Sequence, residues 1–394
     1  MDTQAEFKTD GSQTDDVVTR LNAVRDVLSA EYRKRHDDPW IVAYSGGKDS
    51  TLLLQLVWET VTALPPHERR RTIYVIGNDT LVESPLVIRH LKNSLGMVRD
   101  AAHAAELPIT TTITEPDIDQ TFWVNVIGRG YIPPTRNFRW CTDRMKIKPT
   151  DRLLEKLART HKRTVLLIGT RRSESQNRRR SMKKHGVKAD TMNPHGSIKG
   201  CRMFSPLADL SDDDVWMILM QRKPPWGKSH RDLITLYRNA GGGECPLVLS
   251  KEDAPSCGTT SPRFGCWTCT VINKDRSLRG LIASGHEEEE KLETLADFRE
   301  WLIELREDNR NRLPVRRDGR TKLRGDGSRV MGPFKLEVRE AILGRLQQME
   351  KQIGESLLSS AEREIIEDIW RHDYIREDGR LSLLAACGPE EVRG

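Results

Sequence analysis

The sequence predicts an α/β fold with a doubly wound parallel sheet. Short apolar runs, typical of strands buried on both faces, alternate with stretches whose apolar residues recur at helical spacing. A glycine-rich turn, Ser45-Gly46-Gly47, follows the first apolar run at residues 40–44. Ligands in such folds bind at the carboxyl ends of the strands, so this turn marks the expected site.

The predicted elements follow in chain order. An apolar repeat from Val17 to Leu28 predicts a first helix that ends near residue 34. Strands are expected at residues 40–44, 72–76, 109–113 and 165–168, and helices at 49–61, 85–95 and 148–157.

The last part of the chain is expected to be helical. Pro333 precedes a stretch with apolar residues on one helix face, and Ser359 with Glu362 forms a capping box ahead of another helix. We therefore expect four segments: an N-terminal helix (1–36), a sheet domain (37–240), a segment with four cysteines (241–286) and a helical C-terminal region (287–394).

Composition limits the class of protein. The chain has 394 residues, 37% of them hydrophobic and 31% charged, and 64 Lys and Arg against 58 Asp and Glu give a net charge of +6. These values exclude a fibrous or largely disordered chain and permit a polyanionic partner. No signal-peptide pattern opens the sequence and no apolar stretch is long enough to span a membrane. With seven cysteines, we expect a cytoplasmic protein with metal or sulfur chemistry and no membrane partner.

The turn after the first strand is expected to bind phosphate. Its two glycines let the backbone expose its amides, and the following helix adds its positive end. The pattern is not the Walker A motif, and the alternative is a tight turn that binds nothing. The candidate ligands are Ser45, Gly46, Gly47, Lys48, Asp49 and Ser50.

The cysteines of residues 241–286 are expected to hold a metal group. Two of them form a CxxC motif, and four thiolates in one loop suit either a structural zinc ion or an iron–sulfur cluster. Spacing alone leaves these two open, with unligated buried thiols as a third reading. The four residues are Cys245, Cys257, Cys266 and Cys269.

Cys141 stands apart from that set in the sequence. Arg139, Arg144 and Lys146 surround it, and positive charge is expected to lower the pKa of its thiol and favour the thiolate. A thiolate there suits a persulfide carrier that delivers sulfur, whereas the alternative is a buried structural cysteine.

One basic stretch is a candidate nucleic-acid contact, since arginine binds phosphate in a bidentate manner, and a second contains glycines that would let it mould to a partner. Charged runs are also often simply solvated. The first stretch contains Arg178, Arg179, Arg180, Lys183 and Lys184, and the second contains Arg316, Arg317, Arg320, Lys322, Arg324 and Arg329.

The SGGKDS motif after a buried strand resembles the PP-loop of ATP pyrophosphatases, which share an adenine nucleotide α-hydrolase-like fold. Segments 139–149, 169–178 and 205–216 are similar to motifs of the phosphoadenylyl-sulfate reductase branch. Together with segments 242–248 and 264–275, the set resembles the DndC-like sulfurtransferases of bacterial DNA phosphorothioation over about residues 16–280.

This resemblance implies an enzyme that hydrolyses ATP to AMP and pyrophosphate and activates a DNA phosphate for replacement of a non-bridging oxygen by sulfur. It implies Mg²⁺ at the loop, a [4Fe–4S] cluster on the four cysteines, a cysteine desulfurase as sulfur donor and partner proteins of the same system. Lys48, Asp49 and Cys141 would be catalytic, and Gly169 and Arg171 would join the loop in binding nucleotide.

Three other functions compete with this one. A phosphoadenylyl- or adenylyl-sulfate reductase is expected to carry an ECG(L/I)H tail, whereas residues 386–390 read ACGPE, and an adjacent cysteine pair is missing because Trp140 precedes Cys141. A tRNA thiolation enzyme usually shows two CxxC motifs or an RNA-binding domain, and neither is visible. A binding module with an inactive loop is the non-enzymatic alternative.

Overall fold

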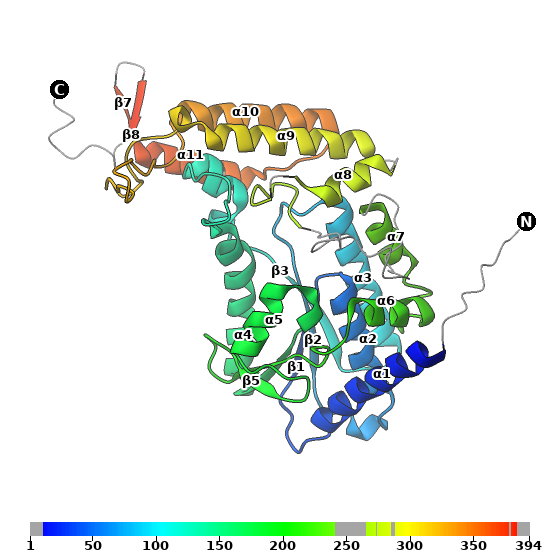
Figure 1. Ribbon diagram of the computed structural model, residues 1–394. Helices are drawn as coiled ribbons and strands as arrows, with labels where there is room; N and C mark the ends of the chain where they lie inside the picture. The colour runs from blue at the N-terminus through cyan, green and yellow to red at the C-terminus, as the bar shows by residue number, and fades with distance from the viewer. Residues whose placement is uncertain (1–10, 241–264, 273, 285–287, 378–379, 384–394) are drawn as a thin grey trace, which may run out of the picture. The chain divides into compact units, whose positions relative to one another are not determined.

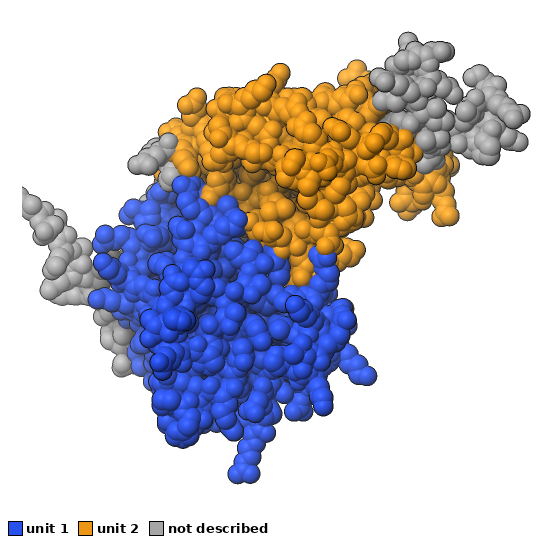
Figure 2. Space-filling model, turned by 180° about the vertical axis from the view of Figure 1, so that it is seen from behind, with its two compact units in different colours: residues 1–78, 86–114, 151–262 blue, residues 79–85, 115–150, 263–394 orange. Residues whose placement is uncertain are grey.

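The computed structural model describes residues 11–240, 265–272, 274–284, 288–377 and 380–383. The chain divides into two compact units, coloured separately in Figure 2. Unit 1 consists of Met1–Asn78, Leu86–Thr114 and Asp151–Pro262, and unit 2 of Asp79–Pro85, Glu115–Thr150 and Arg263–Gly394. Two stretches that the sequence assigned to the sheet domain, 79–85 and 115–150, thus belong to the unit that contains the C-terminal helices.

Unit 1 is built on a six-stranded sheet in the order β3-β2-β1-β4-β6-β5, parallel except for β5 (Figure 1). The predicted doubly wound α/β fold and its four strands are confirmed, whereas the last two strands were not predicted because neither, MNP in β5 or CRMF in β6, is a continuous apolar run. The strands are β1 (Trp40–Ala43), β2 (Ile73–Asn78), β3 (Ile109–Thr114), β4 (Thr164–Leu167), β5 (Met192–Pro194) and β6 (Cys201–Phe204).

Helices cover both faces of this sheet, and neighbouring residues of β2 show how. Ile76 packs with Leu154 of α4 on one face, whereas Gly77 lies against Leu91 and Leu95 of α3 on the other. Successive strand residues point to opposite faces, so both faces are buried. The helices of this part are α1 (Gly11–Tyr32), α2 (Lys48–Thr62), α3 (Pro85–Ala104), α4 (Lys148–His161), α5 (Gln176–Lys184), α6 (Asp212–Gln221) and α7 (Arg231–Ala240).

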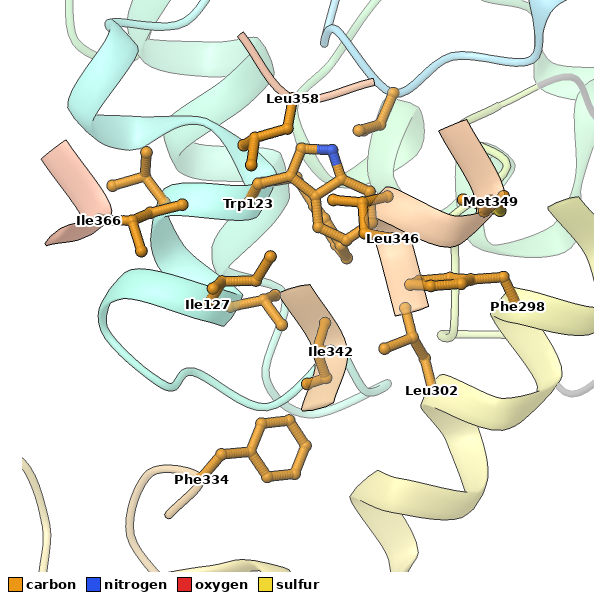
Figure 3. Close-up of a cluster of buried hydrophobic side chains, with 14 of the residues drawn as sticks. Trp123, Ile127, Phe298, Leu302, Phe334, Ile342, Leu346, Met349, Leu358 and Ile366 are labelled. Atoms are coloured by element: carbon orange, nitrogen blue, oxygen red, sulfur yellow. The ribbon is translucent and has the colours of Figure 1, made fainter. Parts of the chain in front are cut away.

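Unit 2 is helical around its own apolar core. A π-helical turn spans Val124–Gly128. Its Ile127, and Trp123 just before it, pack among side chains of the C-terminal helices such as Phe298 and Ile342 (Figure 3). A second π-helical turn spans Thr142–Ile147. The remaining elements are α8 (Arg276–Ala283), α9 (Glu289–Glu307), α10 (Leu336–Ile353), α11 (Ser360–Asp373), β7 (Tyr374–Glu377) and β8 (Arg380–Leu383).

The start of α11 confirms the capping box expected from the sequence. The Glu362 amide donates to the Ser359 hydroxyl at 3.2 Å, and the Ser359 amide donates to the Glu362 carboxylate at 2.9 Å. Among the described helices, none is both long and apolar enough to cross a membrane.

His230 gives unit 1 a pH dependence that can be tested. Its imidazole is buried against the Gln55 side chain at 2.8 Å, and burial lowers its pKa to about 4. The unfolded chain, with a histidine pKa near 6.5, binds the proton first, so the stabilisation is complete above pH 6.5 and is lost as the pH falls toward 4.

As the pH falls from 6.5 to 4, we expect protonation of His230 to lower the free energy of unfolding by about 3 kcal/mol. Urea unfolding of the wild type and of His230→Gln across this range measures the difference, because the variant lacks the titrating ring. A wild type and variant with parallel pH profiles would contradict the assignment.

Candidate functional site

The loop between β1 and α2 exposes the amino end of a helix. Gly46 has a φ of +73°, and the N-cap position of α2 is Gly47, which offers no side chain to cap the first amides. The Lys48 amide contacts the Tyr237 hydroxyl of α7 at 3.3 Å. Amides at a helix start carry partial positive charge, so this geometry suits a phosphate group.

Four charged side chains meet beside this loop. The buried guanidinium of Arg171, with 0% of its surface exposed, donates to Asp49 at 2.6 Å and to Asp212 at 2.5 Å. The ammonium of Lys48 lies 3.4 Å from each of the same two carboxylates. Two cations and two anions therefore balance in one network that joins β4, α2 and α6.

The pKa values of the network agree with this pairing. Burial by itself lowers the pKa of Lys48 and of Arg171, but the neighbouring carboxylates outweigh it, so both pKa values are raised. Burial likewise raises the pKa of Asp212, yet Lys48 and Arg171 outweigh it and the pKa is lowered. All three groups are therefore charged at neutral pH.

The two residues expected to bind nucleotide after β4 have structural roles in this arrangement. A Cβ on Gly169 would lie 2.9 Å from the Asp49 carbonyl oxygen, so only glycine allows β4 to end against the start of α2. Arg171 also donates to Ser173 and to the Leu210 carbonyl. Direct nucleotide contact by Gly169 and Arg171 stays a prediction.

Sequence reasoning missed Asp212 and Tyr237. Asp212 is the first residue of α6, in an acidic run whose capping box pairs Ser211 with Asp214. It lies in segment 205–216, whose similarity to a reductase motif gave Asp212 no role. Tyr237 comes from α7, almost two hundred residues after the loop, and no local pattern signals it. Helices α2, α6 and α7 lie side by side in Figure 1, which explains the convergence.

The first basic stretch forms an exposed helix, α5. Ser175 caps it by accepting from the Arg178 amide, and only Met182 of the helix is buried. The predicted nucleic-acid contacts lie on this helix, and their binding of nucleic acid stays a prediction. They are Arg178, Arg179, Arg180, Lys183 and Lys184.

Three cysteines come together in unit 2. Cys141 interacts electrostatically with Cys269, and Cys266 with Cys269. The Thr80 hydroxyl lies 3.2 Å from the Cys266 sulfur, and Glu83 lies 3.7 Å from it. The proximity of Cys141 to the CxxC pair was not predicted, because more than a hundred residues separate them in the sequence.

The expected low pKa of Cys141 is wrong. Burial, the largest effect, raises the pKa of this thiol, and Lys146 lowers it by less. Arg139 is exposed, and Arg144 is engaged with the Gln120 side chain and the Tyr131 hydroxyl. The charge adjacent in sequence therefore does not outweigh the effect of burial on the Cys141 pKa.

Two buried arginines of α9 hold the loop that follows Cys269. Arg299 donates to the carbonyls of Cys269, at 2.7 Å, and of Ile272. Arg306 donates to the Thr270 carbonyl at 2.8 Å and to the Pro134 carbonyl at 2.9 Å. These contacts fix the backbone beside the CxxC pair and place two positive charges behind it.

The described residues alone do not complete a metal site, since no group of three His, Cys, Asp or Glu among them is arranged to hold an ion. Cys245 and Cys257, predicted as ligands, lie outside the described residues. The donor chemistry of Cys141, Cys266 and Cys269 nevertheless suits a thiolate-bound group, with backbone and charge already organised around it.

Replacing Arg171 tests the charge network. Arg171→Met leaves the two carboxylates with Lys48 as their shared cation, and because both are partly exposed we expect a loss of about 2–3 kcal/mol in the free energy of unfolding. Arg178→Met removes an exposed pair with Glu174 and is the matched control, with a loss of about 0.5 kcal/mol or less. Urea unfolding measures both, and equal losses would contradict the network.

Replacing Arg299 tests the support of the cysteine loop. In Arg299→Gln the carbonyls of Cys269 and Ile272 lose charged donors, so we expect amide hydrogen exchange at residues 266–272 to accelerate about 30-fold. Arg279→Gln, which removes only an exposed pair with Glu300, is the control. Unchanged protection in Arg299→Gln would show that the loop is held by other contacts.

Comparisons with known proteins agree with the PP-loop geometry. The family model described as the phosphoadenosine phosphosulfate reductase domain matches residues 39–272. An uncharacterized protein of Methanocaldococcus jannaschii is 29% identical over 191 residues, which make up 48% of this chain and 33% of the relative. The matched part thus spans about a third of that relative's length.

Two solved structures are similar to the chain at low identity and with low TM-scores. Phosphoadenylyl-sulfate reductase from Candida auris is 14% identical with a TM-score of 0.33, over 54% of this chain and 86% of that one. The U34-tRNA thiolase NcsA of Methanococcus maripaludis, with its [4Fe-4S] cluster, is 13% identical with a TM-score of 0.35, over 74% and 81%. Since the family model covers more than half of the sequence, the chain belongs to the phosphoadenosine phosphosulfate reductase domain family of the PP-loop ATP pyrophosphatase superfamily.

Proposed function

We propose that the protein is an ATP-dependent sulfurtransferase of DNA phosphorothioation, a DndC-like enzyme of the cytoplasm. The observation that carries the ATP part is the uncapped start of α2 beside the balanced network of Lys48, Asp49, Asp212 and Arg171. The sulfur part is supported by the cysteines gathered in unit 2. The choice of DNA is supported by the combined sequence motifs and by the exposed basic helix α5.

The loop would bind the pyrophosphate portion of ATP. Amides at the start of α2 and the Lys48 ammonium are the donors, and the hydroxyls of Ser45 and Ser50 lie 3.2 Å apart beside them. The network is neutral as it stands, so the charge of ATP calls for a further cation. Mg²⁺ would supply it, with the Asp49 carboxylate as a suitable oxygen ligand.

The proposed reaction has three balanced steps. A non-bridging oxygen of the DNA phosphate attacks the α-phosphorus of ATP, and pyrophosphate leaves. The terminal sulfur of a persulfide on Cys141 attacks the activated phosphorus, and AMP leaves with that oxygen. A second thiol then attacks the Cys141 sulfur, the sulfur–sulfur bond breaks in favour of the phosphorothioate, and a disulfide forms between the two thiols. A cysteine desulfurase would supply the persulfide, and other proteins of the system would present the DNA.

The cysteine loop would hold a [4Fe–4S] cluster, with zinc as the alternative. Cys266 and Cys269 are the described ligands, Cys245 and Cys257 the further predicted ones, and the place of Cys141 beside Cys269 makes it a candidate ligand as well. When bound, such a cluster supplies electron transfer or an iron site for sulfur.

A phosphoadenylyl-sulfate reductase is the second candidate function, and the family match over residues 39–272 favours it. The ACGPE sequence at residues 386–390 departs from the tail of those reductases. Sulfite formation from a phosphoadenylyl-sulfate substrate by the purified protein would establish that activity in place of DNA sulfuration.

The proposed function is tested by mass spectrometry of nuclease-digested DNA from the host. Sulfur-containing dinucleotides should vanish on deletion of the gene and return with the wild type and with Cys201→Ser, whose thiol is buried in β6. They should stay absent with Lys48→Ala, which we expect to slow pyrophosphate release at least 100-fold by removing a phosphate donor. Dinucleotides that persist in the deletion would overturn the proposal.

Cys141→Ser separates the two roles of this cysteine. If Cys141 only carries sulfur, the variant keeps the iron content of the wild type and forms no sulfur-containing dinucleotides. A variant that loses iron identifies Cys141 as a ligand, and a variant that still sulfurates DNA excludes it as the carrier.

A further inference from the structure

A basic two-stranded ribbon projects from unit 2 between α9 and α10. This basic ribbon consists of residues 322–330, part of the gold loop in Figure 1, and every residue from 320 to 329 is exposed. The ribbon belongs to the second basic stretch of the sequence, which the proposed function leaves without a role.

The base of this ribbon is fixed to its unit. The Gly332 amide donates to the Leu313 carbonyl and the Leu313 amide to the Pro333 carbonyl, at 2.7 and 2.9 Å. A Cβ on Gly332 would overlap the carbonyl oxygen of Val315, so the two chains cross in close contact. Arg312 also donates to the Gly332 carbonyl at 2.9 Å. The ribbon therefore extends from a defined support.

The two arms of the ribbon are joined by a single antiparallel bridge, between Leu323 and Arg329. The Arg324 amide donates to the Ser328 carbonyl and the Val330 amide to the Lys322 carbonyl, both at 2.7 Å. Gly327, with a φ of +78°, closes the turn, and Asp326 accepts from the Ser328 amide at 2.9 Å. The hydrogen bonds hold the exposed side chains in a fixed register.

This register places cations on both faces of the ribbon. Leu323 lies opposite Arg329, so these two side chains share one face, and Lys322 and Arg324 point to the other. Leu323 is 61% exposed. Among the described residues, neither Lys322 nor Arg329 has an ion-pair partner, whereas Arg317 nearby is paired with Asp373.

We propose that the basic ribbon inserts into the major groove of duplex DNA, an inference that rests on the proposed function for its choice of DNA. A DNA groove has phosphates along both of its walls. Cations on both faces of the ribbon can contact two such walls, whereas a single flat surface of phosphates would be contacted by one face only. The major groove of B-form DNA, about 12 Å wide, admits a two-stranded ribbon. The major groove of an RNA duplex is too narrow for one.

Leu323 gives the ribbon an apolar contact between its cations. In the major groove the apolar group available to it is the thymine methyl. Lys322, Arg324 and Arg329 would neutralise phosphates, whose contacts carry affinity and salt dependence rather than sequence preference. The ribbon would thus hold the DNA and favour thymine where Leu323 enters.

The first test measures binding of the full chain to a fluorescent DNA duplex by anisotropy between about 50 and 200 mM salt. In Lys322→Gln/Arg324→Gln we expect the slope of log K against log salt to fall by about 2 and affinity to fall about 10-fold. Arg276→Gln/Lys351→Gln removes two exposed cations of α8 and α10 in the same unit and should retain the wild-type slope.

Three results would overturn the proposal: a ribbon variant that binds like the wild type, an equal loss in the control variant, or equal ribbon-dependent binding of an RNA duplex. A wild type that binds no DNA would overturn it together with the proposed function. Ribbon-dependent DNA binding in a protein that forms no sulfur-containing dinucleotides would support this inference and contradict only the proposed function.

The second test replaces thymine by uracil in the duplex, which removes only the methyl group. The wild type should bind the uracil duplex about 3-fold more weakly, because one buried methyl is lost. Leu323→Gln should bind both duplexes equally. A wild type that does not distinguish them would overturn the placement of Leu323 in the major groove.

Discussion

Arg171 has no exposed surface, and its guanidinium is shared by Asp49 at the start of α2 and Asp212 at the start of α6. A buried guanidinium is tolerated only when its donors are satisfied, so these elements must meet at this point. Gly169 completes the constraint by letting β4 end against the Asp49 backbone. The start of α2 is therefore held in place by ion pairing behind it.

Unit 2 also contains buried guanidinium groups whose donors are satisfied, but the acceptors are backbone carbonyls. Arg299, Arg306 and Arg339 are all buried, and each donates to main-chain carbonyls. A planar guanidinium with five donors can join several irregular segments at once, which an apolar side chain cannot do. In this unit the irregular segments include the loop after Cys269. Because its backbone is held from α9, the thiols need not rely on regular secondary structure for their position.

Periodicity predicted much of the fold because the parallel strands and the amphipathic helices are long enough to show it. The short strands β5 and β6 lack such a period, and the division into units depends on contacts between distant segments. The loop motif predicted Lys48 and Asp49, but Asp212 and Tyr237 reach them only through tertiary packing. The pKa of Cys141 was mispredicted for the same reason, since burial and the actual partners of Arg144 decide it.

The cations of the chain fall into two physical classes. Lys48 and Arg171 beside the loop are matched by carboxylates, so these two cations add little net field outside the protein. Those of α5 and the basic ribbon are exposed, and most have no carboxylate beside them among the described residues. Their charge is therefore accessible to a polyanion. A small nucleotide and a long polyanion would then be bound by separate sets of charges, and substitutions in one set should leave the other intact.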